Sequence, residues 1–279
     1  MTGFRLPTAA TLALLLVACS SASAPKIYIG SGLGHTIKTY TAAGVQTTPT
    51  ITLPHELQAM AVDAAGKIYV VESDDTVTTY TAAGVKTTPT ITGLRGPSAI
   101  AVDAAGKIYV AEMDKVTTYT PAGLKTTPTI TGPGTPMSVA VDAAGKIYVW
   151  DFDNNAITTY TAAGVQTTPT LALVEGLFAV DASGKMYVVD RPLETYKADG
   201  TPTPAIALPK GSDVYALAID GAGKIYVLSA ANTGNQSTLT TYNADGTPST
   251  PTITGLPGKL TVKLDRSTSG TSTPIIAVR

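Results

Sequence analysis

The chain has 279 residues, of which 44% are hydrophobic and only 14% charged, and its formal net charge at pH 7 is −1. This balance, without any run of Lys or Arg, excludes the basic surface that holds a nucleic-acid backbone. With 26 Gly and 19 Pro, the composition favours turns and extended segments over helices.

The first predicted element is a leader, residues 1–18. Its apolar run Ala9–Ala18 is too short to span a bilayer and is typical of a secretory signal. The run ends in Leu16-Val17-Ala18-Cys19, which resembles the bacterial lipobox. The resemblance implies that Cys19, the single cysteine, is lipidated and becomes the first residue after cleavage. An ordinary signal peptide that happens to contain a cysteine is the alternative.

Residues 19–25 are then a lipidated tether, and residues 26–279 are the folded domain. Several acyl chains hold a protein durably at a membrane. We therefore expect a monomer in the bacterial cell envelope, attached to the membrane through its N-terminal lipid.

From residue 26 the chain repeats a unit of about forty residues. The motif Lys-Ile-Tyr, once Lys-Met-Tyr, places its tyrosine at positions 28, 69, 109, 148, 187 and 226. A second tyrosine follows at 40, 80, 119, 160, 196 and 242. A fixed period of this length is typical of repeat architectures such as propellers.

One unit contains four segments rich in Val, Ile, Thr and Tyr, which we name strands A to D; in the third unit they cover residues 97–103, 108–112, 115–120 and 124–130. Turns centred on Gly separate them, and this pattern predicts a four-stranded antiparallel meander. No part of residues 26–279 shows a convincing helical period.

The A strands alternate bulky and small apolar residues. Ile100 and Val102 flank Ala101, for example, and the other units repeat the pattern. A strand that is apolar on both sides must be covered on both sides. Each unit is therefore a blade that is stable only between neighbours.

The D strands carry a proline nine residues after the second tyrosine, at positions 49, 89, 128, 169 and 251. Proline cannot donate a ladder hydrogen bond and belongs on an edge strand. This position predicts that strand D forms the outer rim.

The two ends of the repeat predict a closed ring. The first unit begins with strand B at Lys26, and an A-like segment, Leu260–Asp265, follows the sixth unit. We predict an all-β, six-bladed β-propeller of four-stranded antiparallel blades, closed by pairing of this C-terminal strand with the N-terminal strand Lys26–Ile29. Residues 274–279 resemble another B strand and have no place in this scheme.

The repeated pattern Ile-Ala-Val-Asp, a turn, then Gly-Lys-Ile-Tyr-Val and an acid covers nearly all of residues 26–265. It resembles NHL-repeat propellers and, more distantly, strictosidine-synthase-like and gluconolactonase propellers. The motif implies a scaffold and says little about activity.

Functional residues are expected on the face that carries the B-to-C turns and the D-to-A loops. An acid stands three residues after the Lys-Ile-Tyr tyrosine in four consecutive units: Glu72, Glu112, Asp151 and Asp190. These carboxylates could bind Ca²⁺ or another divalent cation, or a cationic ligand. The alternative is that each caps its own B-to-C turn.

The D-to-A loops break the repeat and add Glu56, Glu175 and Asp213, together with His55 and the serines Ser98 and Ser138. Resemblance to metal-dependent gluconolactonase-like propellers implies a metal site at the channel mouth. Those enzymes also use Asn ligands, however, and these loops supply no Asn. The repeated acids Asp63, Asp103, Asp142, Asp181 and Asp220 open the A-to-B turns and are interpreted as structural.

Two functions remain open. The first is an envelope-anchored, non-enzymatic propeller that binds a protein, glycan or small ligand on one face, with no cofactor. The second is a metal-dependent lactonase or gluconolactonase-like hydrolase with its site at the mouth of the central channel. The sequence identifies neither the ligand nor a metal.

Overall fold

The computed structural model describes residues 16–19, 26–31, 35–172, 176–189, 192–209, 212–231 and 236–257. These residues form strands and turns, and no helix among them could cross a membrane. They make six four-stranded antiparallel sheets, numbered here as blades 1 to 6.

The strands of the first three blades follow in chain order. Blade 1 contains β1 (Leu16–Cys19), β2 (Lys26–Ser31), β3 (Thr36–Thr41) and β4 (Gln46–Thr52). Blade 2 contains β5 (Leu57–Val62), β6 (Ile68–Glu72), β7 (Thr76–Tyr80) and β8 (Lys86–Ile91). Blade 3 contains β9 (Ala99–Val102), β10 (Ile108–Glu112), β11 (Lys115–Tyr119) and β12 (Lys125–Ile130).

The last three blades repeat the arrangement. Blade 4 contains β13 (Pro136–Val141), β14 (Ile147–Asp151), β15 (Ala156–Tyr160) and β16 (Gln166–Ala172). Blade 5 contains β17 (Phe178–Val180), β18 (Met186–Val189), β19 (Leu193–Tyr196) and β20 (Pro202–Ile206). Blade 6 contains β21 (Ser212–Ile219), β22 (Ile225–Ala231), β23 (Gln236–Tyr242) and β24 (Pro248–Pro257).

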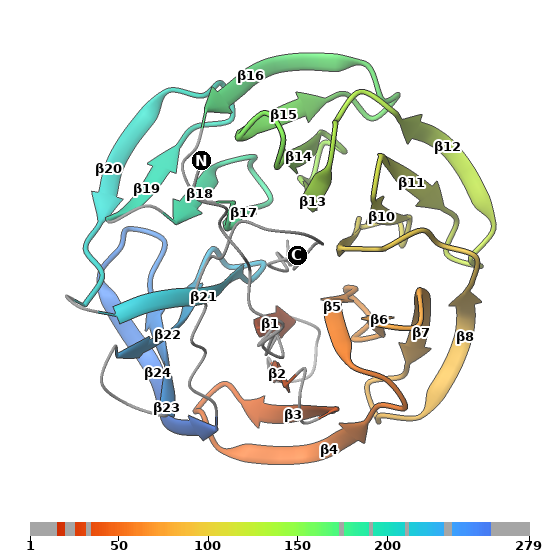
Figure 1. Ribbon diagram of the computed structural model, residues 1–279. Helices are drawn as coiled ribbons and strands as arrows, with labels where there is room; N and C mark the ends of the chain where they lie inside the picture. Colours follow the sequence, from red (N-terminus) through yellow and green to blue (C-terminus); the bar gives the residue numbers. More distant parts are fainter. Residues whose placement is uncertain are drawn as a thin grey trace, which may run out of the picture.

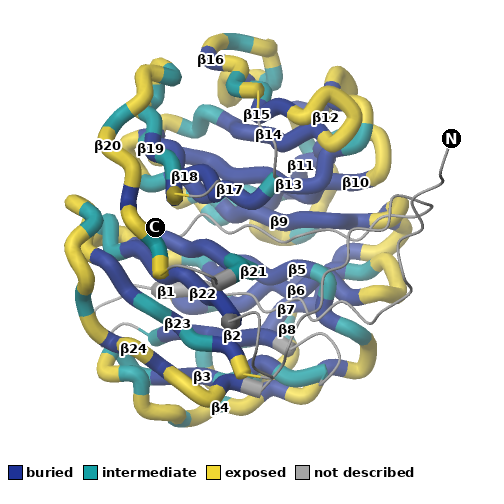
Figure 2. The backbone as a smooth tube through the Cα atoms, turned by 60° about the vertical axis from the view of Figure 1, so that its left-hand side comes forward, coloured by how far each residue is buried: buried dark blue, intermediate teal, exposed yellow. Residues whose placement is uncertain are grey.

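The six blades stand around a central axis, with the first strand of each blade innermost and the fourth outermost (Figure 1). This arrangement confirms the predicted six-bladed β-propeller of four-stranded antiparallel blades. The inner strand β9 is buried along its length, whereas the outer strand β12 alternates between exposed and more buried residues (Figure 2).

Neighbouring blades join through large and small side chains. Ile100 and Val102 of β9 share a core cluster with Ala59 and Ala61 of β5. In the same way Val139 and Val141 of β13 share one with alanines of β9. The bulky residues of one inner strand thus pack against the alanines of the preceding blade, so each blade buries part of its apolar surface against its neighbours.

The prolines of the fourth strands lie on the outer rim, as predicted. At β4 the pairing register shifts where the chain passes Pro49, and the Pro49 carbonyl accepts a hydrogen bond from Thr39 Oγ1 at 2.6 Å. The turn of the next blade covers this proline, because a Cβ atom at Gly84 would lie only 2.7 Å from Pro49 Cβ. A glycine is needed there, and the contact locks blade 2 to blade 1.

The repeated aspartates of the A-to-B turns are structural, as interpreted from the sequence. Asp63 Oδ1 accepts hydrogen bonds from the backbone N–H groups of Ala65 and Lys67 at 2.9 and 2.8 Å. Its other oxygen accepts the hydroxyl of Tyr69 at 3.2 Å. Burial and the nearby carboxylate raise the pKa of Tyr69, so its hydroxyl stays protonated and donates.

The ring is closed between blades 6 and 1. Ile27 and Ile29 of β2 share a core cluster with Ala216 and Ala218 of β21. At the rim, a Cβ atom at Gly44 would lie 2.9 Å from Pro251 Cβ. At the rim, blade 1 therefore packs on blade 6 as blade 2 packs on blade 1.

The predicted closing strand is wrong in one respect. The inner strand of blade 1 is β1, which pairs Leu16 with Ile29 and Cys19 with Lys26, in place of Leu260–Asp265. Residues 16–19 are close enough in the chain to pair with the free edge of β2. We did not predict this pairing, because we assigned residues 1–25 to a leader and a tether outside the propeller. Residues 260–265 and 274–279 lie outside the described residues.

Candidate functional site

The predicted site residues lie on one face of the propeller, which we call the loop face. In blades 2 to 4 this face is formed by the B-to-C turns, residues 73–75, 113–114 and 152–155. The loops that enter the same blades, residues 53–56, 92–98 and 131–135, complete it. The A-to-B and C-to-D turns, with the structural aspartates, form the opposite face.

Three of the predicted acids end the second strands of their blades and are buried, with Glu72 at 1%, Glu112 at 3% and Asp151 at 2% exposure. Each accepts a hydrogen bond from the backbone of the loop that enters its blade. The donors are the N–H groups of His55, Arg95 and Gly134, at 3.1, 3.0 and 3.0 Å respectively.

This arrangement corrects the detail of the structural interpretation. We expected each acid to cap its own B-to-C turn, but Glu72 and Glu112 instead fasten the entry loop to the blade. Asp151 does both, because it also accepts the N–H groups of Thr135 at 3.2 Å and of Asp153 at 3.0 Å. The fourth acid of the series, Asp190, lies outside the described residues.

The hydrogen bonds set the ionisation of Asp151. Burial by itself would raise the pKa of its carboxyl, but the donors Gly134, Asn154, Thr135 and Asp153 outweigh it and hold the pKa below the ordinary value of 3.8. The side chain is thus a charged acceptor that holds a loop. In blade 3, Thr117 Oγ1 adds a second bond to Glu112.

The acids predicted in the entry loops do not form a metal site among the described residues. Glu56 is half-buried in the loop before β5, and Asp213 is half-buried within β21, where its backbone pairs with Ala230. Glu175 lies outside the described residues. No three His, Cys, Asp or Glu side chains in the described ranges are close enough together to hold a metal ion.

The two serines predicted in the entry loops, Ser98 and Ser138, are buried inside the propeller. Ser98 is buried and donates to the Pro136 carbonyl of the next blade at 2.8 Å. Ser138 is fully buried. Neither one faces solvent as a nucleophile would.

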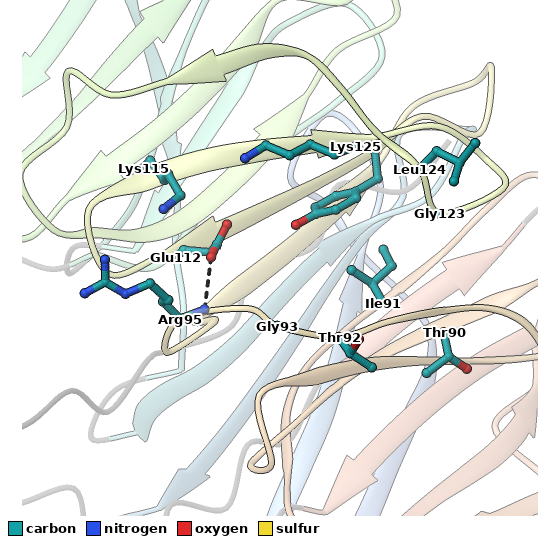
Figure 3. Close-up of a pocket in the computed structure, with 11 residues that line it drawn as sticks. Thr90, Ile91, Thr92, Gly93, Arg95, Glu112, Lys115, Gly123, Leu124 and Lys125 are labelled. Carbon is teal, nitrogen blue, oxygen red and sulfur yellow. Dashed lines mark hydrogen bonds between the residues drawn. The ribbon is translucent and has the colours of Figure 1, made fainter.

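A cavity of about 420 Å³ lies between blades 2 and 3, and we call it the 2/3 groove (Figure 3). One side comes from the end of β8 and the loop after it, and the other from β11 and the C-to-D turn before β12. The groove therefore runs from the loop face to the opposite face. Its lining residues are Thr90, Ile91, Thr92, Gly93, Arg95, Glu112, Lys115, Tyr119, Gly123, Leu124 and Lys125.

The 2/3 groove is rich in positive charge. The side chains of Arg95, Lys115 and Lys125 line it, and their charged ends lie on the side of Glu112 in Figure 3. Lys115 also forms an ion pair with Asp114, with Nζ and Oδ1 3.3 Å apart. The lining carboxylate Glu112 accepts hydrogen bonds from the Arg95 N–H group and from Thr117 Oγ1. The lining thus has three cationic side chains against this one carboxylate.

Tyr119 adds a neutral hydrogen-bond donor to the lining. Burial, and then the charge of Glu112, raise the pKa of its hydroxyl to about 12. The hydroxyl therefore stays protonated at neutral pH and is available to an acceptor.

Two of the three cations break the repeat. At the position of Lys115 the other blades have Thr36, Thr76, Ala156, Pro192 and Thr238, and at that of Arg95 blades 2 and 4 have His55 and Gly134. The third cation, Lys125, does not break the repeat, because blade 2 has Lys86 at the same position. Sequence reasoning followed the acids and missed these cations, although their departure from the repeat was visible.

Exposed apolar side chains stand beside this region on the loop face. Met113, 60% exposed, follows Glu112, and its N–H donates to the Arg95 carbonyl at 3.0 Å. Phe152, 54% exposed, has the same place in blade 4 and contacts Trp150 edge to face, with ring centroids 5.9 Å apart. The loop face of blades 3 and 4 thus offers both charge and apolar surface.

No protein-family model matches the chain, and no curated protein matches it in sequence. Solved structures do match it in shape. A streptogramin B lyase has a TM-score of 0.62 at 14% identity, with 99% of this chain and 90% of that chain covered.

Two further structures match over similar lengths. Virginiamycin B lyase from Staphylococcus aureus has a TM-score of 0.61 at 15% identity, covering 92% of this chain and 88% of that one. A protein of unknown function from Bacteroides caccae has a TM-score of 0.65 at 14% identity, covering 91% and 98%. At these identities the likeness establishes a shared propeller fold and nothing about activity.

Proposed function

We propose that this protein is a non-enzymatic binding propeller of the bacterial envelope, and that it takes a small anionic ligand in the 2/3 groove. The observation that carries the proposal is the set of three cations, Arg95, Lys115 and Lys125, around one cavity. Two of them occur at this blade alone. The scaffold itself does not require these two cations, because the other blades have other residue types at the same positions.

The acids of the loop face support a binding role over an enzymatic one. Glu72, Glu112 and Asp151 are buried, and each accepts a backbone N–H group of the loop that enters its blade. A general base or a metal ligand needs a carboxylate that can reach the substrate or the ion. The lyase activity in the names of the structural neighbours belongs to those proteins, and no feature described above favours it for this chain.

The chemistry of the groove favours a carboxylate or phosphate ligand. Guanidinium and ammonium groups make charge-assisted hydrogen bonds with both anions, and Arg can bind either in bidentate fashion. Thr92 and Tyr119 add hydroxyl groups, and Ile91 and Leu124 add apolar surface for the remainder of the ligand. The cavity has the size of a small-molecule site.

The envelope part of the proposal rests on the lipobox-like sequence that ends at Cys19. A lipid on Cys19 would hold the propeller at a membrane surface while the groove remains open to small molecules. Labelling with a radioactive fatty acid in a bacterial host tests this directly. We expect label on the wild type and none on Cys19→Ser.

Binding is tested by isothermal titration calorimetry on the chain from residue 19 with Cys19→Ser. The probes are inorganic phosphate, citrate and glucuronate, which separate phosphate from carboxylate recognition, and glucose is the neutral comparison. We expect at least one anion to bind and glucose not to bind. Affinity should fall as salt is added, because the cations are partly exposed.

Variants locate the site. Arg95→Gln, Lys115→Gln and Lys125→Gln should each weaken binding about fivefold, as expected for loss of a charge-assisted contact of about 1 kcal/mol. Lys86→Gln is the matched control, because Lys86 has the place of Lys125 in blade 2. Failure of all three anions to bind, or equal weakening by Lys86→Gln, contradicts the proposal.

The enzymatic alternative has its own test. A panel of lactones and esters is assayed with Ca²⁺, Mg²⁺ or Zn²⁺ present, on the wild type and on Glu56→Gln and Asp213→Asn. We expect no turnover. Turnover that either substitution abolishes would replace the binding proposal by a metal-dependent hydrolase.

A further inference from the structure

The C-to-D turns of blades 1 to 4 each expose an apolar side chain on the face opposite the loop face, which we call the turn face. In each blade this side chain follows the glycine of the turn. These residues are Val45, Val85, Leu124 and Val165, with exposed fractions of 63, 62, 68 and 64%. The other large apolar side chains with such exposure in the described ranges are Met113 and Phe152 of the loop face.

The fold does not require these apolar residues, because blades 5 and 6 build the same turn from polar ones. The N–H group of the first turn residue donates to the carbonyl of the exposed residue at 2.8 Å in both blade 2 and blade 5. Blades 5 and 6 have Thr201 and Thr247 in place of the valine or leucine. Two positions earlier they have Asp199 and Asp245, where blades 1 to 4 have an exposed alanine.

Charge on the turn face divides between the same two groups of blades. At the strand ends of this face, blades 1 to 4 have more lysines than aspartates. The lysines are Lys26, Lys67, Lys86, Lys107, Lys125 and Lys146, and the aspartates are Asp63, Asp103 and Asp142. Each of these aspartates accepts a backbone N–H group of its own turn and a tyrosine hydroxyl. In blades 5 and 6 the balance is reversed, with Lys185, Lys197 and Lys224 against Asp181, Asp199, Asp220 and Asp245.

The chain also enters blade 1 at the turn face. Lys26 begins β2 and pairs with Thr41, the residue that ends β3 before the turn carrying Val45. Residues 20–25 alone separate Lys26 from Cys19, and an extended chain spans about 3.5 Å per residue. A lipid on Cys19, a step that rests on the proposed function, would therefore hold the turn face near the membrane.

A lipid surface fits this distribution better than a folded partner does. The four turns lie at successive places around the rim of the ring (Figure 1), so their apolar side chains are spread over four blades. A flat, fluid surface can contact all four at once without a complementary shape. Apolar side chains in the headgroup region, with lysines beside anionic lipids, are typical of proteins that bind at a membrane interface.

We propose that the turn face of blades 1 to 4 rests on an anionic lipid surface. The four exposed apolar side chains enter the headgroup region, and the lysines of the same face lie beside the lipid phosphates. Asp199 and Asp245 keep blades 5 and 6 away from the surface, because carboxylates and anionic lipids repel each other. In this orientation the loop face, with Arg95 at the 2/3 groove, is directed away from the membrane.

Co-flotation with lipid vesicles tests this orientation on the full chain with Cys19→Ser, which cannot be lipidated. The vesicles contain phosphatidylglycerol in phosphatidylcholine, or phosphatidylcholine alone. We expect binding to the vesicles with phosphatidylglycerol, weaker binding to phosphatidylcholine alone, and a decrease in binding as salt is added. Residues 1–18 are present in every variant, so their own contribution to lipid binding cancels in the comparison.

A triple variant, Val45→Thr with Val85→Thr and Val165→Thr, locates the contact. It introduces the residue that blades 5 and 6 have at this place, so the turns are retained. Binding to the anionic vesicles should fall about tenfold, because three apolar side chains no longer enter the interface. The matched control, Met113→Thr with Phe152→Thr, removes exposed apolar side chains from the loop face and should bind as the wild type does.

The converse variant extends the apolar turns to blades 5 and 6. It combines Asp199→Ala and Thr201→Val with Asp245→Ala and Thr247→Val, and so reproduces the turns of blades 1 to 4. Binding to the anionic vesicles should become severalfold stronger, because two acids are removed and two apolar side chains are added. Binding no stronger than that of the wild type would contradict the proposal.

The proposal is overturned if the wild type does not bind the anionic vesicles, or if the triple variant binds them as well as the wild type. Loss of vesicle binding in Arg95→Gln, with the triple variant unaffected, would place the lipid phosphate in the 2/3 groove instead. Self-association that the triple variant abolishes, without vesicle binding, would make a second copy of the chain the partner. The triple variant leaves the lining of the groove intact. Its anion binding should therefore be unchanged, and failure of one proposal leaves the other standing.

Discussion

At the scale of single residues, the buried acids at the ends of the second strands determine how the loop face is built. Their carboxylates accept backbone N–H groups of the incoming loops, so each loop has one position relative to its blade. A buried carboxylate with several donors is a strong structural contact, and removing it leaves those donors unsatisfied. The acids thereby position the loop that carries Arg95 at the 2/3 groove.

Asp151 provides the test at this scale. Asp151→Ala should lower the free energy of unfolding by about 2–4 kcal/mol, because four donors lose a buried charged acceptor. Asp114→Ala is the control, since Asp114 is an exposed acid of a neighbouring B-to-C turn. The measurement is urea unfolding at pH 7, where the control should change little.

The pH dependence follows from the lowered pKa of Asp151. A carboxyl with a lowered pKa in the folded state contributes stability above its ordinary pKa, and the contribution is lost as pH falls through the folded value. The difference in free energy of unfolding between wild type and Asp151→Ala should therefore become smaller below about pH 4. A difference that stays constant down to pH 2 would contradict the role of the charge.

For these acids, the sequence predicted their place on the loop face better than their hydrogen-bond partners. The fixed phase after each Lys-Ile-Tyr motif placed Glu72, Glu112 and Asp151 correctly on the loop face. Their partners could not be predicted, because the N–H groups come from loops 17 residues earlier in the chain. Only the packed blade brings the two together.

At the scale of elements, the blades are held by two sets of contacts. Near the axis, bulky residues of one inner strand pack on alanines of the preceding one. At the rim, the C-to-D turn of one blade covers the outer strand of the preceding blade, at a proline in five contacts and at Ile206 between blades 5 and 6. The alternation of large and small residues predicted the first set, whereas the turn contact depends on the curvature of the ring and was not predicted.

Two glycines test the rim contact. Gly84 and Gly93 have nearly the same positive φ, 79° and 74°, but a Cβ at Gly84 would lie 2.7 Å from Pro49 Cβ, whereas nothing lies within 4 Å at Gly93. Both substitutions by Ala have the backbone cost of about 1–2 kcal/mol. Gly84→Ala should cost a further 1–3 kcal/mol, roughly, because it overpacks the contact between blades.

Chemical denaturation of the two variants measures this difference. If Gly93→Ala proves as destabilising as Gly84→Ala, the contact between blades 1 and 2 does not carry the stability that we assign to it. The backbone term cancels in the comparison, so only the crowding is tested.

At the scale of the whole molecule, six blades close into one ring, and the groove is a product of that closure. The repeat in the sequence was sufficient to predict the architecture and the outer position of the prolines. The inner strand of blade 1 was not predicted correctly, because the candidate strands at the two ends both lie outside the regular repeat. The 2/3 groove was missed because two blades share it, and no single unit contains it.

The central claim is that the groove between blades 2 and 3 is the ligand site. The most direct test is an NMR titration of the isotope-labelled protein with the anion that binds best, followed through backbone amide shifts. We predict shifts confined to Thr92, Gly93, Arg95, Lys115 and Lys125, with the corresponding residues between blades 1 and 2, Thr52, Leu53, His55, Thr76 and Lys86, unchanged. Equal shifts in both grooves, or shifts centred on the channel mouth at Glu56 and Asp213, would contradict the claim.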